Sequence, residues 1–545
     1  MKYLFLVLVL ILSLIVPSEA MGYAPLFANA QAKHPYSLMS GLGTHHHPVS
    51  TDNPEAQKFF DQGLNLIYAF NHDEAVRSFK KAAELDPHLA IAYWGIALGL
   101  GANINLDIDP DREQVADQAV QQALALSPQA SAPEQDYINA LAKRYSHNPH
   151  ADLYQLAVNY AKAMQNLVQR YPDDLDAATL YAESLMDLHP WDLWSHDGKP
   201  QADTLEIITV LESVIQRDRN HPGANHYYIH AVEASPSPER ALKSAKRLET
   251  LVPAAGHLVH MPSHIYFRVG DYQRAMASNQ QAIAQDETYF LKNHIVEGIY
   301  PWMYYNHNIH FLAIASAMAG RHEDALQAAD KLVANATPLV PVLPMIESYL
   351  STKILIQVYF GDWDDILKTP APDAKLVTTK PLWHFAHGMA NAATGKIEKA
   401  KGDSNALLEC QKTIPVTAVI GLSTANQILD IAANLLQAKI ATAEGNYDSA
   451  IKFLETAVSQ EDALNYIEPP AWYIPTRFAL GDVLLAKGDY AAAEKVFRAD
   501  LQKYPHKRLS LLGLQATLQA QLVQAELAKV EKNSDTQLQV QNLRS

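Results

Sequence analysis

Two segments near opposite ends of the chain carry the same spacing of small, aromatic and proline residues, and this repeat limits the possible folds more than any other feature. In residues 56–87 and 474–505, a glycine, an alanine, a phenylalanine and a proline follow one another at identical intervals. Small residues let two helices pack closely, and a proline ends a helix because it lacks an amide hydrogen and clashes with the preceding turn. The spacing therefore predicts a repeated helix–turn–helix unit. The shared residues are Gly63, Ala75, Phe79 and Pro87 in the first segment and Gly481, Ala493, Phe497 and Pro505 in the second.

The turn between the two helices also recurs. A glycine, a polar residue and an aromatic residue or histidine stand together at five places, beginning at Gly270, Gly320, Gly361, Gly445 and Gly488. Over most of residues 54–525 the chain resembles the tetratricopeptide repeat family. The resemblance implies an all-α protein, a right-handed superhelix (an α-solenoid) of helix–turn–helix repeats, with a concave groove lined mainly by the first helix of each repeat. It also implies protein–protein interaction as the family's ordinary role.

The first residues are typical of a secretory signal peptide. Lys2 precedes the apolar run Leu4–Val16, which is shorter than the ~20 residues that span a bilayer, and a small-x-small cleavage pattern follows at Ser18 to Ala20. We therefore expect a periplasmic or secreted protein with no stable membrane insertion after cleavage; an uncleaved membrane anchor is the alternative.

Four segments are expected along the chain. Residues 1–20 form the signal peptide, residues 21–53 an N-terminal extension that contains His45, His46 and His47, residues 54–530 one continuous repeat array, and residues 531–545 a polar tail. The repeat pattern is degenerate at about 90–222. The three successive histidines are read either as a solvated stretch or as a metal-capturing arm.

Composition excludes several functional classes. The chain has 59 acidic against 43 basic residues and a formal net charge of −16, which argues against nucleic-acid binding because that needs a basic surface. The one cysteine, Cys410, excludes an internal disulfide framework and cysteine-rich metal sites. No phosphate-binding loop or nucleophile motif is present, so the sequence gives no evidence for a serine or cysteine nucleophile.

Histidines recur at fixed positions in three consecutive central repeats. The repeats are aligned on the alanine of the second helix, which is Ala241, Ala275 or Ala325 and is taken as position i. In other repeats, position i−15 is apolar, as at Phe60, Leu435 and Phe478. In the central repeats, His226, His260 and His310 occupy position i−15, His230 and His264 occupy i−11, and His257 and His307 occupy i−18.

This arrangement predicts a transition-metal site in the groove. Imidazole is a common ligand of Zn, Cu and Fe, and two histidines four residues apart on a helix face the same side. A carboxylate such as Glu233 could complete the ligand set, which also admits Mn. The site would serve metal binding or, in an alternative reading, metal-dependent catalysis. The candidate ligands are His226, His230, Glu233, His257, His260, His264, His307 and His310.

Two readings without a metal remain open at this point. In the first, the groove binds a protein, a peptide or a small anionic ligand through imidazole hydrogen bonds and aromatic stacking. In the second, the histidines form a polar packing seam of a pure interaction scaffold. Family members that grip a C-terminal carboxylate use Lys, Asn and Arg in the groove, and histidines stand in their place here. The aromatic candidates are Tyr227, Tyr228, Tyr266, Trp302, Tyr304 and Tyr305.

Overall fold

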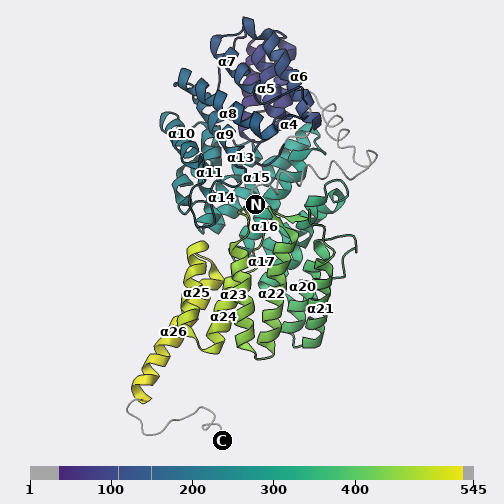
Figure 1. Cartoon of the computed structure of the whole chain (residues 1–545), viewed down its shortest axis with the longest axis vertical. Helices are drawn as coiled ribbons and strands as arrows, with labels where there is room; N and C mark the ends of the chain where they lie inside the picture. Colours follow the sequence, from purple (N-terminus) through teal and green to yellow (C-terminus); the bar gives the residue numbers. More distant parts are fainter. Residues whose placement is uncertain (1–35, 108–109, 149, 532–545) are drawn as a thin grey trace. The chain divides into compact units, whose positions relative to one another are not determined.

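The computed structural model describes residues 36–107, 110–148 and 150–531, and almost all regular structure within them is α-helical. The predicted signal peptide and residues 532–545 of the predicted tail lie outside the described residues. The chain forms two compact units (Figure 1). Unit 1 extends to Ala315 and includes Ala334–Val342 and Tyr466–Pro469; unit 2 comprises Ser316–Val333, Leu343–Asn465 and the chain from Pro470 onward.

In both units, successive helices pack against each other in antiparallel pairs, so the predicted all-α repeat fold is confirmed. Unit 1 contains α3 (Pro54–Tyr68), α4 (His72–Leu85), α5 (Ala90–Leu100), α6 (Pro110–Leu126), α7 (Ala132–Leu141), α8 (Leu153–Arg170), α9 (Leu175–Met186), α10 (Thr204–Arg217), α11 (Pro222–Glu233), α12 (Leu242–Leu251), α13 (Gly256–His260), α14 (Pro262–Arg268), α15 (Tyr272–Asn293) and most of α16 (Tyr305–Met318).

Unit 2 has the same helical construction with one short hairpin. Its helices are most of α17 (His322–Ala336), then α18 (Thr352–Phe360), α19 (Trp363–Ile366), α20 (Thr379–Ala393), α21 (Ile397–Gln411), α22 (Ala425–Ala443), α23 (Tyr447–Asp462), α24 (Thr476–Lys487), α25 (Tyr490–Lys503) and α26 (Arg508–Glu531). Strands β1 (Val419–Ile420) and β2 (Ser423–Thr424) pair antiparallel.

The two glycines predicted to allow close helix packing, Gly63 and Gly481, each pack against a buried phenylalanine, and a second glycine that was not predicted packs against the same ring. A Cβ atom placed on Gly63 or Gly95 would lie 2.7 or 2.5 Å from the ring of Phe79, so both helices approach that ring more closely than any larger residue allows. The same arrangement surrounds Phe497 in unit 2, where Gly481 and Gly513 take these two places. Each ring is fully buried. The repeated spacing in the sequence therefore corresponds to one repeated packing unit.

The recurrent turn glycines are needed for their backbone conformation. Gly270, Gly320, Gly361, Gly445 and Gly488 all have φ between 74° and 88°, the left-handed region in which a side chain is strained. Each ends one helix and lets the chain reverse into the next.

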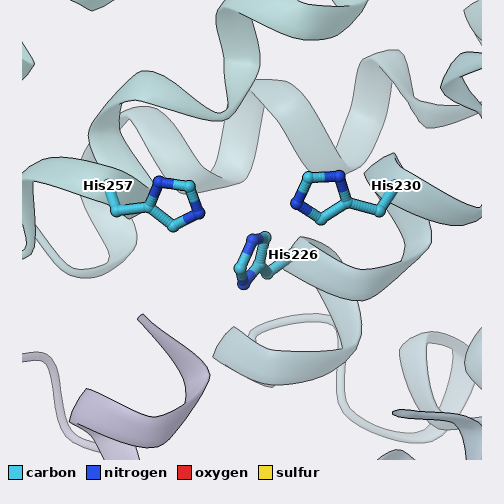
Figure 2. A group of neighbouring side chains, drawn as sticks. All are labelled: His226, His230 and His257. Atoms are coloured by element: carbon cyan, nitrogen blue, oxygen red, sulfur yellow. The ribbon is translucent and has the colours of Figure 1, made fainter. Parts of the chain in front are cut away.

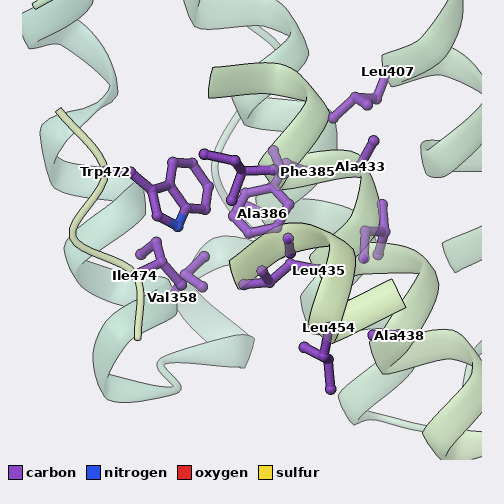
Figure 3. Packing of buried hydrophobic residues seen from close by; sticks show 14 of the residues in the cluster. Val358, Phe385, Ala386, Leu407, Ala433, Leu435, Ala438, Leu454, Trp472 and Ile474 are labelled. Carbon is purple, nitrogen blue, oxygen red and sulfur yellow. The ribbon is translucent and has the colours of Figure 1, made fainter. Parts of the chain in front are cut away.

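The core of unit 2 is a continuous apolar cluster. Trp472, which is 2% exposed, packs against Phe385 with ring centroids 5.6 Å apart, and Val358 and Ile474 lie beside Trp472 (Figure 3). Residues of α20, α22 and α23 extend the same apolar cluster. Within the described part of the chain, no helix combines the length and the apolar character needed to cross a membrane.

Candidate metal centre

Helix α11 carries three of the predicted ligands, His226, His230 and Glu233, through the interior of unit 1. Every residue of this helix is buried, because α3, α9, α10, α12 and α14 all pack around it. The side chain of His221 caps its first turn by accepting a hydrogen bond of 3.2 Å from the amide of Ala224. The helix is therefore a rigid support for its polar side chains.

Three histidines from two repeats meet in the first cluster. His226 and His230 lie one turn apart on α11, and His257 comes from α13 of the following repeat. Figure 2 shows the three rings around a common space. One nitrogen of each ring lies within 4.8 Å of the other two. We name this group, His226, His230 and His257, cluster 1.

Hydrogen bonds fix which nitrogen of each ring carries the proton. His226 Nδ1 lies 2.7 Å from the carbonyl oxygen of Tyr68, and His230 Nδ1 lies 2.7 Å from Glu233 Oε1. A carbonyl and a carboxylate only accept hydrogen bonds, so both Nδ1 atoms are donors and both Nε2 atoms carry a lone pair. Within the described residues, these two Nε2 atoms and both ring nitrogens of His257 are buried without a hydrogen-bond partner.

The surroundings of cluster 1 keep its imidazoles neutral. The ring of Phe70 lies 4.6 Å from that of His226 and 5.5 Å from that of His257. Burial, followed by the effect of the neighbouring histidines, holds the pKa of His226 and His257 well below the usual value, and burial also lowers the pKa of His230. Neutral imidazole is the form that binds a metal.

The next repeat forms a second group, His260, His264 and His307, which we name cluster 2. His260 ends α13, His264 lies on α14 beyond the break at Pro262, and His307 lies on α16. His260 Nε2 is 2.9 Å from His264 Nε2 and 3.1 Å from His307 Nε2. The ring of Phe311 packs against all three rings.

Glu233 lies between the clusters and binds one histidine of each. Its Oε1 accepts from His230 Nδ1 at 2.7 Å, and its Oε2 accepts from His264 Nδ1 at 2.5 Å. Burial by itself would raise the pKa of Glu233, but the two histidines outweigh it and lower the pKa to about 2. Each of its oxygens accepts one of these bonds, so Glu233 orients two histidines. Glu233 also forms, with His230 and His264, a group whose donor atoms lie close enough to hold a metal ion, as the sequence predicted.

The predicted location in an open groove is wrong for most of these residues. The histidines of cluster 1, together with His260 and His264, are 0–6% exposed and lie inside the packed helices of unit 1. His307 is half-buried. The repeat alignment placed these histidines on the surface of a groove. The helices of unit 1 enclose them instead, because five other helices surround α11. Truncation of these side chains would therefore leave cavities and unpaired polar groups in the core.

His310 is the one predicted histidine that the structure places in neither cluster. It lies one turn beyond His307 on α16 and belongs to no group of metal-competent donors among the described residues. Burial lowers its pKa to about 4. The alignment offset of His310 matches that of His226, but no histidine follows four residues later to complete a pair.

A small cavity of about 20 Å³ lies beside cluster 1. His230 and Glu233 line it on one side, and Trp191 lies with its ring edge-on to His230 at 5.6 Å. The indole of Trp191 donates to Asn105 Oδ1 at 3.1 Å, which holds this wall in place. A space of this size holds about one water molecule. The remaining lining is largely apolar: Ile104, Met186, His189, Leu193, Ala234 and Tyr466.

A third histidine group, around Asp176, was missed by the sequence reasoning. His45 and His47 of the N-terminal segment lie 2.9 and 2.8 Å from the two carboxylate oxygens of Asp176. His221 Nε2 at 3.2 Å and the Tyr68 hydroxyl at 2.5 Å complete the set. Every one of these groups has a hydrogen-bond partner, so the arrangement is a structural latch. The triple histidine was visible in the sequence, but nothing there identified Asp176 as its partner.

The bonds of His45 and His47 to Asp176 predict that residues 36–53 bind the rest of unit 1 more tightly at lower pH. Burial lowers the pKa of His45 and His47, but the hydrogen bond and charge of Asp176 outweigh it and raise both values above the ordinary one. The stabilisation is therefore complete below ~6.5, the unfolded value, and is lost as the pH rises through the raised folded values. Amide hydrogen exchange of residues 36–53, corrected for intrinsic rates, should be slower at pH 6 than at pH 8. Asp176→Asn should abolish this difference, and an unchanged difference in that variant would contradict the latch.

Comparisons with known proteins give similarity at the level of helical architecture. No family model matches the chain, and no curated protein matches it in sequence. Among solved structures, it is similar to the Cut9–Hcn1 hetero-tetramer of the APC/C (13% identity, TM-score 0.32, covering 85% of this chain and 76% of that one). It is also similar to yeast Tom70, with 12% identity, a TM-score of 0.30, and coverage of 89% of this chain and 93% of that one. Human IFIT1 with m7Gppp-AAAA is similar at 12% identity, with a TM-score of 0.34 and coverage of 87% of this chain and 91% of that one.

Proposed function

We propose that this protein binds a transition metal ion, copper or zinc, through His226, His230 and His257. The observation that carries the proposal is the set of buried ring nitrogens that face one another without a hydrogen-bond donor. A buried polar atom without a partner costs about 1–3 kcal/mol, and such atoms are rare in folded proteins. One metal ion would coordinate one unpartnered nitrogen of each of the three rings.

The surroundings of the ring nitrogens support metal binding more than a packing seam. In a seam, each ring would donate to one neighbour and accept from another. Here the Nδ1 atoms of His226 and His230 are held by Tyr68 and Glu233, as the outer partners of metal-bound histidines are, and the Nε2 atoms are left facing inward. The peptide-binding reading is weakened because the rings are buried away from any surface that a peptide could reach.

The donor set narrows the choice of metal. All three donors are imidazole nitrogens, which suit copper and zinc, whereas Mn prefers carboxylate and water oxygens. The affinity order of divalent ions places Cu(II) above Zn at a nitrogen site. Three protein ligands leave a fourth position, which a water molecule or another small ligand would fill.

Metal loading of the untagged full-length protein tests the proposal. Protein stripped with a chelator, reloaded with Cu or Zn and desalted should retain the metal, and X-ray absorption should show nitrogen ligands at ~2.0 Å. His257→Gln should lose the ion of cluster 1. This substitution breaks no side-chain hydrogen bond within the described residues, because neither ring nitrogen of His257 has a partner.

The matched control is His310→Gln, which removes a histidine that the structure places outside both clusters. It should leave the metal content unchanged. Circular dichroism should confirm that both variants remain helical. Retention of less than about a tenth of an equivalent by the folded wild-type protein, with either metal in excess, would contradict the proposal.

Export and a binding partner are further parts of the proposal. The sequence of residues 1–20 supports cleavage near Met21 and a periplasmic or secreted mature protein, and intact-mass measurement of the mature chain tests this. A full-length mass in the membrane fraction would contradict it. The tetratricopeptide-like fold supports a protein or peptide partner, which co-purification with the tagged native protein would test.

A further inference from the structure

We infer that cluster 2, His260, His264 and His307, holds a second ion, so that two successive repeats carry equivalent metal sites coupled through Glu233. The inference rests on the proposed function for the class of metal, copper or zinc. Its own evidence is a different set of contacts, one repeat further along the chain.

The two clusters are built from the same repeat positions. Each takes the histidines at positions i−15 and i−11 of one repeat, and a third histidine from position i−18 of the next repeat. The three pairs of equivalent residues are His226 and His260, His230 and His264, and His257 and His307. Because neighbouring repeats pack in similar ways, the same offsets bring the same three rings together twice.

The series contains no third site of this kind. In the repeat aligned on Ala325, position i−11 is Ile314, so this repeat lacks one of its two helix histidines. In the repeat aligned on Ala241, position i−18 is Gly223, where a Cβ atom would lie 2.4 Å from the ring of Tyr68. The site before cluster 1 is therefore also absent. The described residues contain two complete sets of this pattern.

The hydrogen bonds of cluster 2 place two lone pairs against each other. Asn279 Nδ2 donates to the carbonyl of Ala275 at 2.8 Å, which orients its Oδ1 toward His260 Nδ1 at 2.6 Å. His260 Nδ1 is therefore a donor, and His264 Nδ1 is a donor to Glu233. Both Nε2 atoms then carry lone pairs, yet they lie 2.9 Å apart. Two neutral rings repel each other in this arrangement unless a cation lies between them.

A metal ion accounts for this geometry better than a proton does. At a tetrahedral zinc site, two ligands bonded at about 2.1 Å are separated by about 3.4 Å. At a square-planar copper site, two ligands bonded at right angles at about 2.1 Å are separated by about 3.0 Å. The observed separations from His260 Nε2, 2.9 Å to His264 and 3.1 Å to His307, are close to that value. One extra proton could link only one pair of nitrogens, whereas His260 Nε2 lies close to the Nε2 atoms of both His264 and His307.

Glu233 couples the two sites because it is the outer partner of one ligand in each. It fixes the Nδ1–H form of both His230 and His264, and it supplies a negative charge between two buried cations. A glutamine in its place could accept from only one Nδ1, because its other terminal atom is an amide nitrogen that donates. Loss of such an outer partner typically weakens metal binding 10–100-fold, and here both sites should weaken.

Metal counting on matched variants tests the second site. His257 and His307 occupy equivalent repeat positions, each belongs to one cluster only, and neither contacts Glu233. Loaded with Zn or Cu and desalted, the wild-type full-length protein should retain two equivalents. His257→Gln and His307→Gln should each retain one equivalent, and the double variant should retain almost none. Glu233→Gln should bind both ions more weakly, whereas Glu347→Gln, at a buried carboxylate of unit 2 that accepts from Thr378, should not change either affinity.

The outcomes separate this inference from the proposed function. One equivalent in the wild type, lost in His257→Gln and kept in His307→Gln, would overturn the second site and leave the first intact. No retained metal in the folded wild type would overturn both. Loss of both ions in either single variant would contradict two separate sites. If a variant fails to fold, the wild-type stoichiometry and the number of absorber–nitrogen contacts per ion still decide between one and two ions.

Discussion

Removal of bound metal is expected to lower the melting temperature of the protein by roughly 10 °C. A ligand at 1,000 times its Kd stabilises the folded state by about 4 kcal/mol for each site. Each kcal/mol corresponds to about 1–2 °C in a unit of more than about 300 residues, so two occupied sites give a shift of this size. The loss has a structural cause, because stripping returns the nitrogens of cluster 1 to a buried state without partners. Calorimetric melts of metal-loaded and chelator-treated protein, at equal concentration, measure the difference.

The control is the His257→Gln and His307→Gln double variant, whose melting temperature should not respond to chelator. Comparison of the two single variants with the wild type gives the contribution of each site. An equal melting temperature for loaded and stripped wild-type protein, with metal confirmed in the loaded sample, would show that the ion binds the unfolded chain as tightly as the folded one. That result would contradict a preformed site.

The repeat spacing carried most of the information about the fold, because it reflects contacts that are local in sequence. The turn glycines, Gly63 and Gly481 were identifiable because they recur at fixed intervals in the repeat. Gly95 and Gly513, which pack against the same two rings from the following helix, were not identified. The division of the chain into two units was not visible, because it depends on packing between segments distant in sequence, such as Tyr466–Pro469 in unit 1.

The two histidine clusters were predictable in their residues but not in their arrangement. Repeat offsets singled out seven histidines, and six of them fall into the two clusters. The pairing across repeats, in which His257 joins the histidines of the preceding helix, depends on the angle between successive repeats and has no sequence signal. The sequence also carried no signal for the position of Glu233 between the two clusters. Nor did it indicate that Phe70, whose backbone adopts φ 53°, packs against cluster 1.

The substitution Phe79→Ala is expected to destabilise the fold by about 3–5 kcal/mol, the range for removing a fully buried aromatic ring. Phe79 is 0% exposed, and its ring fills the space that glycines on two neighbouring helices, α3 and α5, leave open. Neither glycine has a side chain that could move into the cavity, so the site cannot collapse easily. Urea unfolding followed by far-UV circular dichroism measures the change in the free energy of unfolding.

Two further substitutions show whether this cost comes from the repeat packing. Phe497→Ala removes the equivalent ring in unit 2, also between two glycines, and should cost a similar amount. Leu291→Ala, at a side chain that is 78% exposed, should change the free energy of unfolding by about 0.5 kcal/mol or less. A cost below about 1 kcal/mol for Phe79→Ala would mean that the two helices close over the vacated space. The glycines would then not be what fixes the spacing between repeats, and the shared pattern at both ends of the chain would need another physical explanation.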